Sequence, residues 1–306
     1  MSRSLLTIAC SAALAFGLTA CERNSSAPVS ASAPQPVAAT LQTQVYNPGA
    51  QGIFPVTSVL VTGPRDAVLV DAQFSTADAA KLVDMIKASS KYLTTIYISH
   101  GDPDYYFGLE TLKAAFPDAR IVATPQTVAH IEQTRAGKLA YWSKPLGAGA
   151  PKQTIVPDVL QGDHIDLDGQ SLQIIGLDGA TPDRTFVWIP STRTALGGIP
   201  VMAGEHVWMA DTQTPQSHAD WLATLDRIAA LKPQAVIPGH FAPGAPQNLE
   251  AVKFTGDYIR AYDEEAAKAK NSAELIAAMQ KRYPNLAGEQ SLQMSAKVSK
   301  GEMKWP

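Results

Sequence analysis

The feature that most constrains the fold is an alternation of short apolar, β-branched runs with amphipathic segments along most of the chain. Residues 57–63 and 67–72 predict a hairpin of buried strands, because a Gly-Pro-Arg-Asp turn separates them. Ser75, with Asp78 three residues later, predicts the start of a helix whose apolar residues recur at helical spacing. Strands that alternate with helices in this way are typical of α/β proteins.

The same pattern continues as far as His240. It predicts further strands and helices, with the strands at 94–99, 119–124, 154–160, 163–169, 171–179, 185–190 and 234–240 and the helices at 109–115, 125–135 and 218–233. From this mixture we expect two β-sheets packed together with helices outside them. Two helical stretches, 247–270 and 272–283, are expected to form a C-terminal extension that spans residues 246–306.

Composition sets limits on the partners. The chain is 45% hydrophobic and 17% charged, which is enough apolar material for a large core. A formal net charge of −3 leaves no broad basic face, so we expect no nucleic-acid partner.

The N-terminus predicts export. Arg3 precedes an apolar run, residues 5–18, that is shorter than the ~20 residues a bilayer-spanning helix needs and has the order of a secretory signal. Residues 18–21, LTAC, resemble the lipobox of bacterial lipoproteins, which implies that residues 1–20 are removed and that Cys21 is acylated. An ordinary signal with an incidental cysteine is the alternative.

The resemblance implies a periplasm-facing lipoprotein, and Glu22 after the cysteine favours the outer membrane over the inner one. Residues 21–43 are rich in Ala, Pro and Ser and predict a tether, so membrane contact is expected through the N-terminal lipid anchor only. Removal of Cys10 with the signal leaves Cys21 without an internal disulfide partner.

Two histidines stand at strand ends, where loops commonly present functional groups. His100 ends one apolar strand and is followed by Asp102 and Asp104, and His240 ends another. On its own this spacing is weak, since turns are rich in Asp. Of the other histidines, His206 beside an aromatic residue is a candidate pocket wall, whereas the rest are interpreted as surface or capping residues: His130, His164 and His218.

Residues 44–245 resemble the metallo-β-lactamase fold of metal-dependent hydrolases, and the lactonase-like branch is closest in style. The stretches that carry the resemblance are SHGDPDYYFG, GLDGATPDRTFVWIP, TALGGIPV and LDRIAALKPQAVIPGH. The resemblance implies a four-layer αββα sandwich of two mixed β-sheets flanked by helices. It also implies a small-molecule substrate.

The family motif His-x-His-x-Asp-His is altered in this chain. Its first histidine falls on His100 and its aspartate on Asp104, but its second and third histidines fall on Asp102 and Tyr105. A later Gly-His pair falls on Leu177-Asp178, the metal-bridging aspartate on Gly198 and the final histidine on His240. The resemblance therefore implies five candidate metal ligands, which are His100, Asp102, Asp104, Asp178 and His240.

Gly198 supplies no bridging carboxylate, so we expect one divalent ion rather than two. The oxygen-rich ligand set shifts preference from Zn²⁺ toward harder ions such as Mn²⁺, Fe²⁺ or Mg²⁺. Without an ion, neighbouring aspartates repel one another and must take up protons or pair with a base such as Arg184. A metal-free ligand pocket and a structural remnant are therefore the alternatives.

The first hypothesis is a hydrolase of a lactone, ester or amide that uses a metal-activated water. In it Asp104 is a ligand or general base, with Asp183 as another candidate base, and Tyr105 or Tyr106 donates to the oxyanion. Both tyrosines are alternatively anchors of a helix start in the core. The second hypothesis is a catalytically silent lipoprotein that binds a small molecule or an envelope partner. The altered ligand set argues against a β-lactamase proper.

Overall fold

The computed structural model describes residues 40–305, to which all structural statements here refer. The predicted signal peptide, the predicted lipidation site Cys21 and most of the predicted tether lie outside this range. Gln42 and Thr43, which the sequence analysis assigned to the tether, belong to the first strand. No helix in the described range is long and apolar enough to cross a membrane.

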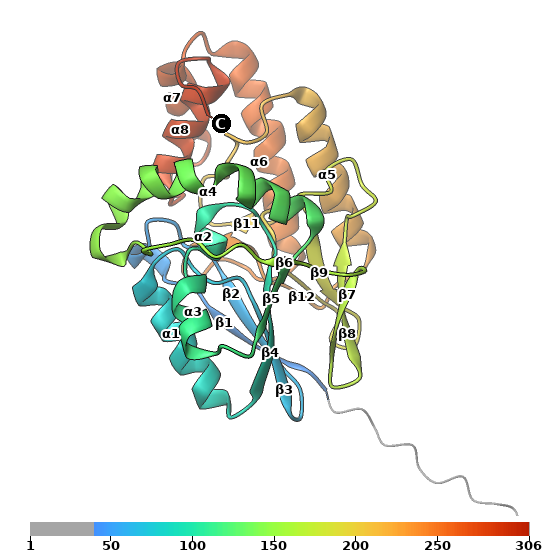
Figure 1. Cartoon of the computed structure of the whole chain (residues 1–306). Coiled ribbons are helices and arrows are strands. Elements are labelled where there is room, and N and C mark those ends of the chain that lie inside the picture. Colours follow the sequence, from blue (N-terminus) through green and yellow to red (C-terminus); the bar gives the residue numbers. More distant parts are fainter. Residues whose placement is uncertain (1–39, 306) are drawn as a thin grey trace, which may run out of the picture. The chain divides into compact units, whose positions relative to one another are not determined.

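The first sheet contains six strands and is mixed (Figure 1). Its order is β1 (Gln42–Tyr46), β2 (Ser58–Thr62), β3 (Asp66–Val70), β4 (Tyr92–Ile98), β5 (Arg120–Ala123) and β6 (Asp158–Val159). The pairs β1–β2 and β2–β3 are antiparallel, which confirms the predicted hairpin, and the remaining pairs are parallel. Only two residues of the predicted strand 154–160 enter the sheet.

The second sheet has five strands, in the order β12 (Ala235–Val236), β10 (Thr194–Leu196), β9 (Phe186–Ile189), β8 (Gln170–Ile175) and β7 (His164–Leu167). The strands β11 (Met202–Ala203) and β13 (His240–Phe241) form a separate, short parallel pair. Buried aliphatic side chains of the two larger sheets form one shared cluster, for example Val61, Val68, Leu172 and Val187. The sheets therefore pack face to face.

Helices flank the sheets, as predicted. In the first half they are α1 (Thr76–Ser89), α2 (Pro103–Tyr106), α3 (Leu109–Ala115) and α4 (Pro125–Leu146). In the second half they are α5 (Pro215–Ala230), α6 (Leu249–Lys268), α7 (Ser272–Arg282) and α8 (Glu289–Ser299). Short 3₁₀ turns occupy Gly49–Gln51 and Gly147–Gly149. The predicted fold class, with its C-terminal helices, is confirmed, although α8 was not predicted.

A buried hydrogen-bond chain joins the ends of three strands. Asp71, just after β3, accepts hydrogen bonds from the Ser99 backbone N–H at 2.8 Å and from its hydroxyl at 2.6 Å. The same hydroxyl accepts from the N–H of Gly198, at 2.6 Å, in the loop after β10. Burial raises the pKa of Asp71 to about 7. These hydrogen bonds hold the end of β4, and the loop that follows it, against the second sheet.

Candidate functional site

The loop after β4 presents the first group of polar side chains. Asp102 occupies the N-cap position of α2, and the buried His100 lies beside it with Nε2 3.2 Å from Asp102 Oδ2. Pro103 at the first helical position suits this turn because its ring is preorganised for a helix start. His100 Nδ1 is buried and has no hydrogen-bond partner in the described part of the chain.

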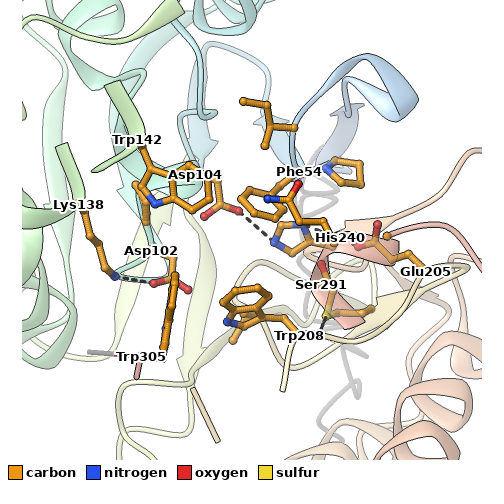
Figure 2. Close-up of a pocket in the computed structure, with 17 residues that line it drawn as sticks. Phe54, Asp102, Asp104, Lys138, Trp142, Glu205, Trp208, His240, Ser291 and Trp305 are labelled. Carbon is orange, nitrogen blue, oxygen red and sulfur yellow. Dashed lines mark hydrogen bonds and ion pairs between the residues drawn. The ribbon is translucent and has the colours of Figure 1, made fainter. Parts of the chain in front are cut away.

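Lys138 of α4 reaches into this loop (Figure 2). Its Nζ lies 2.6 Å from Asp102 Oδ1, and it also contacts His130 Nε2 at 3.1 Å. Burial alone would raise the pKa of Asp102, but the charges of Lys138 and His100 outweigh it and hold that pKa well below the usual range. Asp102 is therefore an ionised carboxylate inside the protein.

Asp211 completes this group. Trp208 Nε1 donates to one carboxylate oxygen at 2.7 Å, Trp305 Nε1 donates to the other at 2.6 Å, and Arg184 Nη2 lies 3.7 Å away. Ligand atoms of His100, Asp102 and Asp211 all lie within 4.8 Å of one another. We call His100, Asp102, Lys138 and Asp211 the Asp102 cluster.

A second group surrounds His240. Its Nε2 lies 3.2 Å from Asp104 Oδ2, and its Nδ1 lies 3.9 Å from Glu205 Oε1. Burial would lower the pKa of His240, but the hydrogen bond with Asp104 and the two carboxylate charges raise it. Burial raises the pKa of Glu205 to about 7, against the opposing charge of His240. We call His240, Asp104 and Glu205 the His240 cluster.

Tyr105 separates the two clusters. Its ring meets His100 edge-on at 5.1 Å between centroids and His240 at 5.6 Å. The side chain is fully buried, and burial together with the Asp104 charge raises its pKa well above 10. Tyr105 and the equally buried Tyr106 pack in the main hydrophobic core and line neither pocket described below.

The structure does not bring every predicted residue to the site. Asp178 is 76% exposed in its side chain and pairs with Arg227 at 2.7 Å, because it lies in an outward-facing loop after β8. His206 points into the C-terminal helices, where its Nδ1 lies 2.9 Å from the Tyr258 hydroxyl. Asp183 is exposed but lines the polar pocket.

Gly198 has no room for a side chain. Its φ is +72°, and a Cβ built there would lie 2.1 Å from the carbonyl oxygen of Thr185. A carboxylate at this position would therefore need the backbone to move. The two clusters have no bridging group from this loop.

Two pockets adjoin the clusters and share Asp102, Lys138 and Trp305, and Figure 2 shows the first of them. One is mainly apolar and also contains the His240 cluster; its apolar walls include Ile53, Phe54, Trp142, Ile199, Met202 and Trp208. The other is polar, and it includes His100, Thr127, His130, Arg184, Asp211 and Gln213. A ligand that enters the apolar pocket thus reaches both clusters.

Lys138, Asp211 and Glu205 were not identified from the sequence. Asp211 stands at the end of the stretch GEHVWMAD, in which only His206 had been selected. Neither Asp211 nor Glu205 ends a long apolar strand, and Lys138 lies within an ordinary helical pattern. The only sequence signal for Asp211 was the acid itself, three residues after Trp208.

Comparison with known proteins gives a consistent result. The sequence model of the metallo-beta-lactamase superfamily matches residues 52–240. The solved structure of DIM-1 metallo-beta-lactamase is 20% identical with a TM-score of 0.53, covering 72% of this chain and 97% of that one. The solved structure of VMB-1 is 16% identical with a TM-score of 0.53, and the match covers 73% of this chain and 94% of that one.

A metallo-beta-lactamase from Pontibacter korlensis is 18% identical with a TM-score of 0.50, and the match covers 74% of this chain and 97% of that one. At these identities the structural likeness shows a shared fold alone. No curated protein gives a significant match.

Proposed function

Because the chain belongs to the metallo-β-lactamase superfamily, whose members are generally metal-dependent hydrolases, we propose that it is a hydrolase with a single divalent ion at the Asp102 cluster. The observation that carries the proposal is the convergence of His100, Asp102 and Asp211 within 4.8 Å. The family normally binds divalent metals, usually zinc. An imidazole with two carboxylates also suits Mn²⁺ or Fe²⁺.

The donors fit one ion and not two. Gly198 has no space for a bridging carboxylate, and Asp104 and His240 contact each other directly. In contrast, His100 Nε2 faces Asp102 Oδ2 at 3.2 Å in a cluster that Asp211 also reaches, so each of the three residues offers one ligand atom to a single ion. When bound, the ion would act as a Lewis acid and make a water more acidic.

The protein's own residues supply the rest. The apolar pocket binds the acyl or aryl part of a lactone, ester or amide and excludes water from the reacting group. His240 lies on this pocket, and its raised pKa favours the protonated form, which can donate a proton to a leaving group. Asp104 orients the imidazole, and its carboxylate stabilises the protonated form before the proton is transferred.

A specific observation favours the second candidate function, a catalytically silent binding protein. Lys138 and Arg184 place two cationic groups beside the carboxylates of Asp102 and Asp211. These charges balance without an ion. A small polar ligand in the neighbouring pocket would then meet a preformed, neutral site.

Metal analysis of the purified full chain by mass spectrometry separates the two functions, with Asp211→Asn as the site variant. The matched control is Asp226→Asn, an exposed aspartate of α5. We expect near-stoichiometric metal in the wild type and in the control, loss of metal in Asp211→Asn, and metal-dependent turnover of a lactone, ester or amide panel. Absence of metal and turnover after loading with Zn²⁺, Mn²⁺ or Fe²⁺ would refute the hydrolase and favour the binding protein.

A further inference from the structure

We propose that the Lys138 ammonium is a built-in cation of the Asp102 cluster, which neutralises Asp102 and leaves to a metal ion only the side of Asp102 that faces His100. The inference rests on the single-ion function proposed above. It starts from three contacts of Lys138 Nζ: Asp102 Oδ1 at 2.6 Å, His130 Nε2 at 3.1 Å and the carbonyl oxygen of Gly101 at 3.4 Å.

These contacts account for the whole ammonium group. A lysine ammonium has three N–H donors, and each has one acceptor here. The acceptors are a carboxylate oxygen, an imidazole nitrogen and a carbonyl oxygen, which are groups that also bind metal ions. The lysine side chain is only 10% exposed, so water replaces little of this coordination.

Gly101 and His130 both allow Lys138 to make these contacts. A Cβ on residue 101 would lie 2.5 Å from His130 Cδ2, so glycine is what lets the loop and His130 approach each other. Lys138 lies two helical turns after His130 on α4, and helical side chains lean toward the N-terminus of their helix. His130 must be neutral to accept from the ammonium, and burial followed by the Lys138 charge lowers its pKa accordingly.

Two consequences follow from a fixed charge at this position. Without metal, Asp102 remains paired, whereas a buried carboxylate without a cation is strongly unfavourable. With metal, the ammonium repels any ion that approaches Asp102 Oδ1, so only the side of Asp102 that faces His100 is available. The folded cleft is therefore independent of metal, and its affinity for metal is limited.

Lys138→Met tests this, because it removes the charge and keeps most of the length of the side chain. Lys144→Met, at an exposed lysine of the same helix, is the matched control. In the full chain with EDTA we expect the melting temperature of Lys138→Met to fall by several degrees and to recover on addition of ZnCl₂. We expect calorimetry to show tighter Zn²⁺ binding, with a Kd at least about tenfold below those of the wild type and the control.

A double variant distinguishes loss of the Lys138 charge from general misfolding of the Lys138→Met variant. Asp102→Asn with Lys138→Met removes both charges, so it should melt higher in EDTA than Lys138→Met alone. The proposal is wrong if Lys138→Met keeps the wild-type melting temperature in EDTA and the wild-type Kd, or if the double variant gains no stability over it. A wild type without metal, beside a Lys138→Met variant that binds Zn²⁺, would refute the single-ion function and leave the role of Lys138 standing.

Discussion

Asp102 and Asp104 are two residues apart in one turn, yet the structure gives them different electrostatic surroundings. Asp102 faces the fixed charge of Lys138, which keeps it ionised. Asp104 faces His240, a group that gains and loses a proton, with Glu205 on its far side. The Asp102 cluster thus contains the permanent charge of Lys138, whereas the charge in the His240 cluster depends on protonation of an imidazole. The lesson is that a motif of adjacent acids takes its chemistry from the distant elements that pack against it.

The two clusters should also contribute to folding stability with opposite dependence on pH. The pKa of Asp102 is lowered in the folded state, so its stabilising contribution is present above the unfolded value of 3.8 and is lost as pH falls. The pKa of His240 is raised, so its contribution is present below 6.5 and is lost as pH rises through the raised value. Acid therefore weakens the Asp102 cluster, and base weakens the His240 cluster.

The largest effect is expected from joining the two clusters with Gly198→Asp. The aspartate meets both an unfavourable φ and the Thr185 carbonyl oxygen, so unfolding free energy should fall by roughly 3–5 kcal/mol, measured by urea denaturation. Gly162→Asp is the control, since Gly162 also has a positive φ but no atom within 4 Å of a built Cβ. Equal stability of the two variants, or a second bound ion in Gly198→Asp, would contradict the separation of the clusters.

The pH response of Glu205→Gln should be the next largest effect. The unfolded glutamate ionises near 4.5, whereas the folded one keeps its proton until about 7, so it lowers wild-type stability as pH rises between these values. The loss amounts to about 3 kcal/mol, and the variant should lack it. Asp71 adds a slope of the same sign that remains in the variant.

Chemical denaturation at several pH values from 4.5 to 7.5 measures this slope, with Glu132→Gln, an exposed glutamate of α4, as the control. The control should follow the wild type. If Glu205→Gln also keeps the full wild-type slope, Glu205 is not a proton-holding member of the His240 cluster.

The sequence predicted those parts of the fold that depend on local signals. The side chain of Ser75 caps α1 at Asp78, as its spacing indicated, and the β2–β3 hairpin follows from its turn. In contrast, α8 begins at Glu289 and its N-cap residue is Gly288, which has no side chain to cap the helix, so no start signal marked it. Local reasoning was sufficient wherever one short segment determines its own conformation.

The site divides in the same way. His100, Asp102 and Asp104 were recognisable because they directly follow an apolar strand. The partner of Asp102 is 36 residues away on a helix, and Asp211 is placed by two tryptophans, one of them 94 residues further along the chain. Such contacts are set by tertiary packing, and no spacing in a single sequence encodes them.

The smallest effect is expected at Asp178, the acid that the sequence selected and the structure leaves outside both clusters. Its carboxylate is exposed and pairs with the half-exposed Arg227, and surface pairs of this kind contribute little to stability. Asp178→Asn should therefore keep the wild-type metal content and melting temperature, measured beside the Asp211→Asn variant. Loss of metal in Asp178→Asn would mean that the loop after β8 folds inward when the ion binds. In that case the Asp102 cluster, unlike the His240 cluster, would be only partly assembled in the structure described here.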